Sequence, residues 1–225
     1  MSGTPPPRDA AALRRFVRES TALEPVPLVP EIALHQATEV TPLWRATAAE
    51  LREWDDSPFW AFAWAGGQAL ARWLLDRPEA VRGRTVLDFG TGSGLVAIAA
   101  ARAGAARVLA FDVDPFCGAA VGLNAEANGV AVEFLARSPL GEPRPGGELL
   151  VAGDVFYERD LAAGFLAWAR ALGGAGTTAL AGDPGRIYSP QGLPEVAAFD
   201  VPTPLELEDR PLRRTRVLHV AGPAP

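Results

Sequence analysis

The chain has 225 residues, 48% of them hydrophobic and 21% charged, which is enough for one large globular domain and unlike the composition of a disordered chain. Arg, Asp or Gly interrupts every long apolar run well before twenty residues, so no segment is expected to cross a membrane. The formal net charge of −6 argues against nonspecific binding to nucleic acid or to anionic lipid.

The residue types available for catalysis are restricted. All 21 basic residues are arginine, which excludes the phosphate-binding lysine of a P-loop, a Schiff-base mechanism and a lysine general base. The single cysteine, Cys117, excludes a disulfide framework within the chain. With only His35 and His219 beside it, we expect no metal site.

The N-terminal part of the chain is expected to be partly helical. A short surface helix is predicted around residues 13–18, prolines then keep residues 24–42 extended, and helical patterns follow at 44–54 and 59–75. Ser57 before Pro58 is typical of a helix start. We therefore predict an extension of residues 1–57 that packs on a main domain of residues 58–225.

Strands and crossover helices alternate from residue 85 onward. The predicted helices are 94–103, 115–128 and 158–172, and the predicted strands are 85–89, 107–111, 130–135, 148–152, 177–181, 196–201 and 213–220. This alternation predicts an α/β fold with a Rossmann-like, doubly wound, seven-stranded and mostly parallel sheet. Ligands of such sheets bind at the carboxyl ends of the strands.

A glycine loop follows the first of these strands, in the sequence Asp88-Phe89-Gly90-Thr91-Gly92-Ser93-Gly94. Alternate glycines allow the backbone to turn sharply and to approach a ligand closely. Leu95 stands where the dinucleotide pattern requires its last glycine, which disfavours an NAD-dependent dehydrogenase. Asp112, 22 positions after Gly90, ends the second strand, where an acid can accept hydrogen bonds from both ribose hydroxyls.

This loop, its strand and the spaced acid together resemble class I S-adenosylmethionine-dependent methyltransferases. The motif Asp154-Val155-Phe156-Tyr157 after the fourth strand is similar to the Asp-x-x-Phe/Tyr motif of the seven-strand lysine methyltransferases. A narrower resemblance is to the electron-transfer flavoprotein beta-subunit lysine methyltransferases. Three stretches carry it, at residues 58–70, 123–128 and 182–186. The resemblance covers most of the chain, although the last forty residues match only in pattern.

The resemblance implies an enzyme that uses S-adenosyl-L-methionine to methylate lysines of the electron-transfer flavoprotein beta subunit. Some members of the family are also associated with ribosomal protein L7/L12. The cofactor-binding residues implied are Asp88, Gly90, Thr91, Gly92, Gly94, Asp112, Trp60 and Asp154. The segment after the third strand, residues 136–139, lacks the acid or amide that often contacts adenine, so adenine recognition stays unassigned.

The chemistry of methyl transfer assigns roles near Asp154. A lysine amine in water has a pKa of about 10.4 and must lose its proton before it attacks. We expect Asp154 to accept a hydrogen bond from the amine and orient it, while the proton leaves through water. Tyr157 is the second predicted catalytic residue, and Trp60, Phe156 and Tyr157 are candidates for lining a lysine channel.

Other side chains have competing interpretations. Phe156 suits the core as well as the channel, and Asp154 is also a candidate N-cap for the helix that follows. Trp64 lies on a helical stripe and is predicted to be core. Arg186 and Asp183 are candidates for binding the protein substrate, in the turn Asp183-Pro184-Gly185-Arg186.

Alternative functions remain open at this point. The chain is also compatible with methylation of another ribosomal protein or of a small amine, and with a cofactor-binding scaffold that lacks turnover. The chain lacks an appended recognition domain of the kind seen on L11 methyltransferases, which lowers the first option. A lysine-free composition rich in Ala and Arg is typical of a bacterium of high genomic G+C, and predicts a cytoplasmic protein.

Overall fold

A computed structural model describes residues 9–38, 58–142, 146–204 and 210–225. Its centre is a seven-stranded sheet with the order β5-β4-β3-β6-β7-β9-β8. The first five strands in that order are parallel, and β9 is antiparallel to both of its neighbours. The strands are β3 Thr85–Phe89, β4 Arg107–Asp112, β5 Glu133–Ala136, β6 Leu149–Gly153, β7 Thr178–Asp183, β8 Glu195–Pro202 and β9 Leu212–Ala221. The predicted fold class is confirmed.

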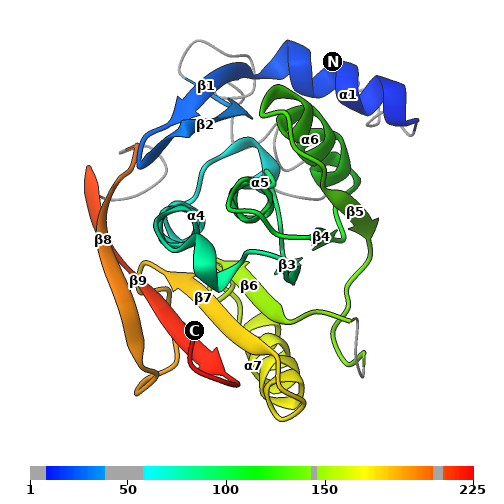
Figure 1. The fold of residues 1–225 in the computed structure, drawn as a ribbon. Helices are drawn as coiled ribbons and strands as arrows, with labels where there is room; N and C mark the ends of the chain where they lie inside the picture. Colours follow the sequence, from blue (N-terminus) through cyan, green and yellow to red (C-terminus); the bar gives the residue numbers. More distant parts are fainter. Residues whose placement is uncertain (1–8, 39–57, 143–145, 205–209) are drawn as a thin grey trace.

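Helices cover both faces of this sheet (Figure 1). One face carries α4 Ala65–Asp76, α5 Leu95–Arg102 and α6 Pro115–Ala127, and the other carries α7 Arg159–Gly173. The apolar residues of β3 alternate between the two layers, because Val86 packs with α4 and α5 whereas Leu87 and Phe89 pack with α7. The period of two in the sequence therefore builds a separate core on each face.

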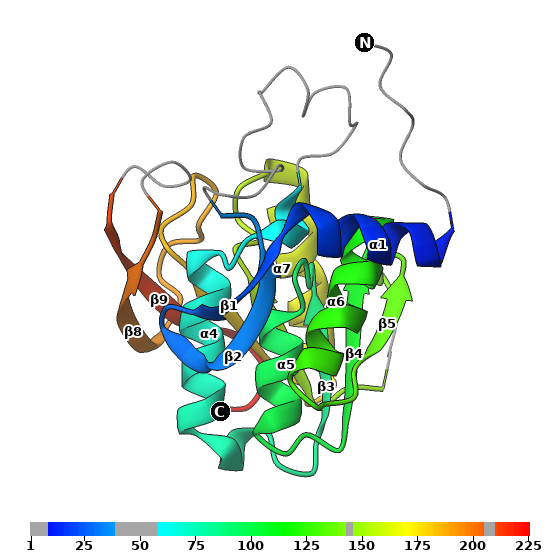
Figure 2. The same ribbon diagram turned by 90° about the horizontal axis from the view of Figure 1, so that it is seen from above.

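The N-terminal part adds helix α1, Ala10–Ser20, and an antiparallel hairpin of β1, Ala22–Val26, and β2, Val29–Gln36. Helix α1 lies across the end of α6 (Figure 2) and buries Leu13 and Val17 there. Two side chains of α6, one turn apart, bind the backbone of β2. Asn124 Oδ1 accepts from His35 N at 2.7 Å, and Asn128 bonds both the N–H and the carbonyl of Ala33.

The predicted helix 59–75 is wrong in its first part. Phe59–Ala61 form one 3-10 turn, Phe62 is extended, and α4 begins only at Ala65. The indole Nε1 of Trp64 donates to the carbonyl of Phe59 at 2.9 Å, which closes the irregular turn before the helix. The predicted helix 44–54, the cap at Ser57 and the boundary at residue 57 lie outside the described residues. Within the described residues, no helix is long and apolar enough to cross a membrane.

Candidate active site

Most of the predicted site residues lie at the carboxyl ends of β3, β4, β6 and β7. The chain runs from β3 to β4 on one side and later returns to β6 on the other side of β3. In open α/β sheets, ligands typically bind at such a reversal, outside the carboxyl ends of the strands. The loop after β3 and Asp112 form one half of the site, and Asp154 with Arg186 forms the other half.

The side chain of Asp88, at the end of β3, holds the glycine loop in place by hydrogen bonds. This side chain is 1% exposed, and its Oδ2 accepts from Thr91 Oγ1 at 2.6 Å and from the N–H of Ala97 at 3.1 Å. Burial raises the pKa of Asp88 to about 7, although both hydrogen bonds oppose this shift. The side chains of Asp88 and the buried Thr91 therefore shape the loop from inside, and their cofactor-binding role stays a prediction.

The open side of the loop is formed by Gly90 and Gly92, which have φ values of 64° and 52°. Asp112 joins them, because its Oδ2 accepts from the N–H of Gly92 at 3.0 Å. Gly94, with φ 83°, has a different role, since a Cβ there would lie 3.1 Å from a side-chain carbon of Val121. It allows α5 to pack closely on α6.

Asp154 directly follows β6 and has a left-handed backbone with φ 56°, which is unusual for a residue other than glycine. Its N–H donates to the carbonyl of Gly182 at 2.9 Å, so the end of β7 holds it in place. Helix α7 begins at Arg159 with Glu158 as its N-cap. The alternative interpretation of Asp154 as the cap of that helix is therefore wrong, and backbone strain of this kind is typical of functional positions.

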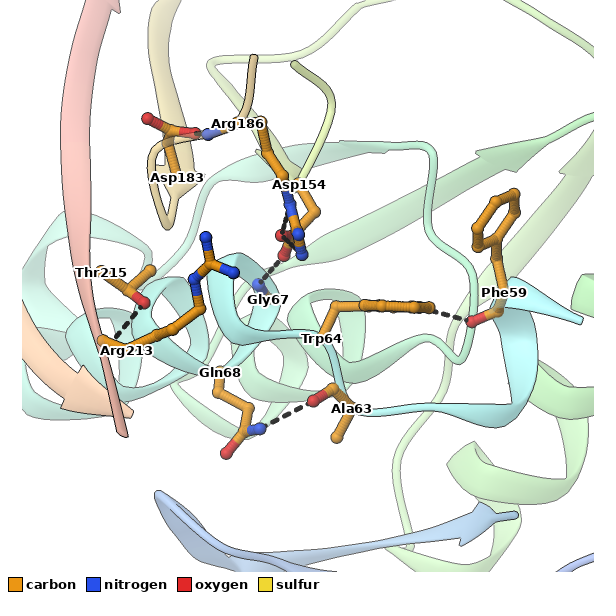
Figure 3. Close-up of polar contacts among 10 residues, drawn as sticks. All are labelled: Phe59, Ala63, Trp64, Gly67, Gln68, Asp154, Asp183, Arg186, Arg213 and Thr215. Atoms are coloured by element: carbon orange, nitrogen blue, oxygen red, sulfur yellow. Dashed lines mark hydrogen bonds and ion pairs between the residues drawn. The ribbon is translucent and has the colours of Figure 1, made fainter. Parts of the chain in front are cut away.

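The carboxylate of Asp154 is surrounded by donors (Figure 3). Oδ2 accepts from the N–H of Gly67 at 3.1 Å, and Oδ1 accepts from Nε and Nη2 of Arg186 at 2.9 and 2.7 Å. The residue is only 8% exposed. Burial raises the pKa of Asp154, while Arg186 and the amide of Gly67 act in the opposite direction.

Two glycines, Gly66 and Gly153, allow the start of α4 to reach Asp154. A Cβ on Gly66 would overlap the carbonyl oxygen of Gly182 and lie 2.5 Å from Oδ2 of Asp154. A Cβ on Gly153 would lie 2.8 Å from the Cα of Gly67. The helix therefore touches the ends of β6 and β7 backbone to backbone, and its N-terminal amides and dipole face the carboxylate.

The loop that carries Arg186 is fixed by Asp183, at the end of β7. Asp183 is fully buried; its Oδ1 accepts from the N–H of Arg186 at 3.0 Å, and its Oδ2 accepts from Ser189 Oγ at 2.6 Å and Arg216 Nη2 at 2.9 Å. The prediction that Asp183 binds a substrate is therefore corrected, because its oxygens serve the loop.

An aromatic surface borders the Asp154–Arg186 pair. Tyr157 is 46% exposed and lies 5.5 Å from the ring of Phe59, which in turn lies 5.8 Å from the ring of Trp64. The guanidinium carbon of Arg186 is 5.8 Å from the Trp64 ring. The prediction that Trp64 is core is wrong, because the chain is not helical at this residue. The two glycines that follow Trp64, Gly66 and Gly67, were the sequence feature that could have indicated a site here.

Trp60 and Phe156 lie elsewhere. Trp60 is 1% exposed and its ring stacks on Phe116 at 5.6 Å, beneath α1. Phe156 is fully buried 5.9 Å from Phe165 of α7. Both rings pack in the core, which favours the core interpretation of Phe156, and the contacts predicted for them with substrate or cofactor stay predictions. Tight packing on α6 and α7 explains their aromatic character.

A cavity of about 560 Å³ lies near the amino ends of the parallel strands, at the other end of the sheet from the candidate site. Its lining includes Arg84, which precedes β3, whereas the glycine loop follows that strand. It is therefore separate from the candidate active site.

The chain is similar to known methyltransferases. The family model for ribosomal protein L11 methyltransferase (PrmA) matches residues 71–151. The electron transfer flavoprotein beta subunit lysine methyltransferase of Xenopus laevis is 44% identical over 179 residues, which cover 79% of this chain and 72% of that protein. The rat protein of the same name is 41% identical over 197 residues, covering 84% and 76%.

A solved structure supports the fold alone. The 16S rRNA methyltransferase RsmC of Thermus thermophilus aligns with a TM-score of 0.52 at 20% identity. The alignment covers 85% of this chain and 47% of that one.

Proposed function

Because this chain belongs to the electron transfer flavoprotein beta subunit lysine methyltransferase family, we propose that it is an S-adenosylmethionine-dependent protein-lysine N-methyltransferase that acts on that subunit. The observation that carries the proposal is Asp154, a buried carboxylate held at the carboxyl edge of the sheet opposite the glycine loop. Two relatives of that name have 44% and 41% sequence identity to this chain over the aligned 179 and 197 residues.

The cofactor half of the site suits S-adenosylmethionine. Gly90 and Gly92 offer backbone without a Cβ on the open side of the loop, and the α5 N-terminus behind them favours an anionic group such as a carboxylate. Each oxygen of Asp112 accepts one backbone N–H, which leaves lone pairs for ribose hydroxyls. The cofactor supplies an electrophilic methyl group bonded to a positively charged sulfur.

The acceptor half has to present a lysine as a neutral nucleophile and keep water away from the reacting atoms. In the transfer, the lone pair of the lysine nitrogen forms the new N–C bond. S-adenosylmethionine, when bound, would supply the methyl group and keep the electrons of its S–C bond on sulfur, and the nitrogen would release a proton to water. Asp154 accepts an N–H of the amine and so directs the lone pair away from itself.

The aromatic surface of Phe59, Trp64 and Tyr157 is proposed as the wall along which the lysine side chain enters. Aromatic faces bind both the aliphatic stem and a cationic or methylated amine. Tyr157 is the predicted catalytic residue that lies on this surface, and its exposure of 46% makes it available to a protein substrate.

Methylation of a ribosomal protein, including L7/L12, is the neighbouring alternative. The family model for L11 methyltransferases ends at residue 151, before Asp154 and the rest of the acceptor half. It therefore supports a methyltransferase cofactor site and does not favour a ribosomal substrate. A small amine, or a scaffold without turnover, has no specific observation in its favour.

Peptide mass spectrometry of the purified flavoprotein beta subunit tests the proposal. After incubation with this protein and S-adenosylmethionine, we expect methyl groups on lysines of the subunit and none when the cofactor is omitted. Unmodified lysines, with a protein that binds the cofactor normally, would reject this substrate. Parallel reactions with L7/L12 and L11 would show whether a ribosomal protein is methylated instead.

We also propose a bacterial, cytoplasmic protein. The support is compositional, because all 21 basic residues are arginine. The relatives described above are, by contrast, animal proteins. Fractionation of the source cells, with the protein detected by antibody, tests the location.

A further inference from the structure

The contact between Arg186 and Asp154 has a consequence for the state of the substrate amine. Two nitrogens of the guanidinium, Nε and Nη2, donate to the same oxygen of Asp154, at 2.9 and 2.7 Å (Figure 3). The two side chains are 18% and 10% exposed. Solvent therefore screens this ion pair only weakly.

The hydrogen bonds already present limit what Asp154 can accept. A carboxylate has about four lone-pair positions. Arg186 uses two of them on Oδ1, the N–H of Gly67 uses one on Oδ2, and the N–H of Gly66 also acts on the carboxylate. At most about one position is left for a substrate, which suits one N–H of a neutral amine. A protonated lysine has three N–H donors to satisfy, and most of them would be left without a partner at this depth.

The charges of the site act in the same direction. Asp154 alone would stabilise an ammonium, but with Arg186 in place the pair has no net charge. The other charged side chains close to this pair come from neighbouring elements. Asp183 of β7, which binds the backbone N–H of Arg186, is paired with Arg216 of β9. An arriving ammonium thus meets a guanidinium beside a neutralised carboxylate, and like charges disfavour its protonated form.

The position of Arg186 is fixed before any substrate arrives. Its backbone N–H is bound by the buried Asp183, and its guanidinium lies over the ring of Trp64 at 5.8 Å. The hydroxyl of Ser189 and the guanidinium of Arg216 hold Asp183 in turn. Residues of β7, β9 and the segment before α4 thus hold Arg186 in the position where it contacts Asp154.

We propose that Arg186 is a positioning residue that keeps Asp154 ionised and charge-neutralised, so that the site accepts the lysine as a neutral amine. This inference rests on the proposed lysine methylation. It replaces the predicted role of Arg186 in gripping the protein substrate. Arg186 acts through Asp154 and does not itself touch the reacting atoms.

The pH dependence of kcat, at saturating cofactor and flavoprotein subunit, tests the inference. In Arg186→Gln the midpoint of the rise in kcat should move upward by about 1 to 3 pH units. Two causes act in that direction: the pKa of Asp154 rises without its cation, and a lysine beside an unpaired carboxylate holds its proton more tightly. Arg186→Lys keeps the charge without the fork of donors and should hold the midpoint near that of the natural protein.

Arg214→Gln is the matched control. Arg214 is also an arginine in an ion pair, with Glu195 at 3.2 Å, but its side chain is 69% exposed on β9. Its loss should leave both kcat and the midpoint unchanged. A loss of kcat by the same factor at every pH in Arg186→Gln, or an equal shift in the control, would overturn the inference.

A second measurement does not depend on the substrate. The carboxyl ¹³C resonance of Asp154, assigned by comparison with Asp154→Asn, should titrate at higher pH in Arg186→Gln than in the natural protein. An unchanged titration would overturn the inference. Absence of methyl transfer by the natural protein would reject the proposed substrate, and this titration would still decide the role of Arg186.

Discussion

The cofactor half of the candidate site, residues 88–94 with Asp112, is built from two neighbouring strand ends, whereas the acceptor half draws on three segments between residues 59 and 186. In the first half the loop backbone and one carboxylate form the open side. In the second half, the backbone N–H of Gly67 in α4 and the guanidinium of Arg186 converge on Asp154. The geometry of the proposed cofactor half thus depends on a local loop, while the acceptor geometry depends on how α4 packs on β6 and β7.

Because the acceptor half depends on this packing, we expect the largest loss of stability from one methyl group added at the contact between α4 and the sheet. Gly66→Ala places a Cβ against the carbonyl of Gly182 and beside the Asp154 carboxylate, so α4 has to move away from the sheet. We expect a loss of at least about 4 kcal/mol in the free energy of unfolding, or a failure to fold, because backbone atoms cannot yield as side chains do. Chemical denaturation measures it.

The adjacent glycine is the control for this substitution. At Gly67 the nearest atom to a new Cβ would be 3.8 Å away, on Leu95, which is an ordinary contact. Gly67→Ala should therefore be neutral or slightly stabilising, since Ala favours the helix. Equal losses in the two variants would refute the close packing of α4 on the sheet.

The buried acid beneath the glycine loop predicts a pH-dependent stability. Asp88, with a pKa of about 7 in the folded state, keeps a proton that the unfolded chain releases near the ordinary aspartate value of 3.8. The free energy of unfolding should therefore fall as pH rises from 4 to 8, by up to about 4 kcal/mol from this group. Asp88→Asn keeps an acceptor for Thr91 and Ala97 and should flatten the slope. Identical slopes in denaturant titrations would disprove the assignment.

Asp112 should affect the cofactor half alone. Removing its carboxylate in Asp112→Ala deletes the predicted ribose acceptor and frees the N–H of Gly92. We expect the cofactor dissociation constant, measured by calorimetry, to rise by about 10- to 100-fold, the loss of one to two charged hydrogen bonds. At saturating cofactor the transfer rate should stay within about ten-fold of normal. A rate that collapses even at saturation would contradict the separation of the two halves.

Trp64 should have the smallest effect, on the acceptor half. Trp64→Ala removes the ring beside Arg186 and Phe59, and we expect KM for the protein substrate to rise about five-fold, as for one exposed cation–π contact. Trp64→Phe keeps an aromatic face and should lose less. A change in cofactor affinity without any change in KM for the protein substrate would show that Trp64 belongs to the cofactor half and not to the acceptor half.

Much of the fold and the cofactor half could be predicted from the sequence, because both depend on local patterns. The seven predicted strands lie at β3–β9, and Asp88–Gly94 and Asp112 were found from their spacing after β3 and β4. Their positions follow from side-chain alternation and from a loop that is continuous in the chain.

The acceptor half was predicted only in part. Asp154 and Tyr157 were found through a motif, but Trp64 was assigned to the core, and Trp60 and Phe156 to the site. The assignment of Trp64 failed because helix periodicity cannot show that α4 begins only at Ala65, and the burial of Phe156 depends on its packing against Phe165 of α7. The buried role of Asp183 likewise depends on Arg216, which lies 33 positions away in the chain.

The central claim is that Asp154 serves the transfer and that cofactor binding is carried by the other half of the site. The most direct test compares Asp154→Ala with the natural protein in two assays, calorimetric titration of S-adenosylmethionine and methyl transfer to the flavoprotein beta subunit. Asp154→Asn, which keeps an acceptor oxygen, is the control for folding. We expect transfer by Asp154→Ala to fall by at least about 100-fold, with the cofactor dissociation constant within about three-fold of normal. Transfer that persists, or cofactor binding that is lost together with it, would contradict the account.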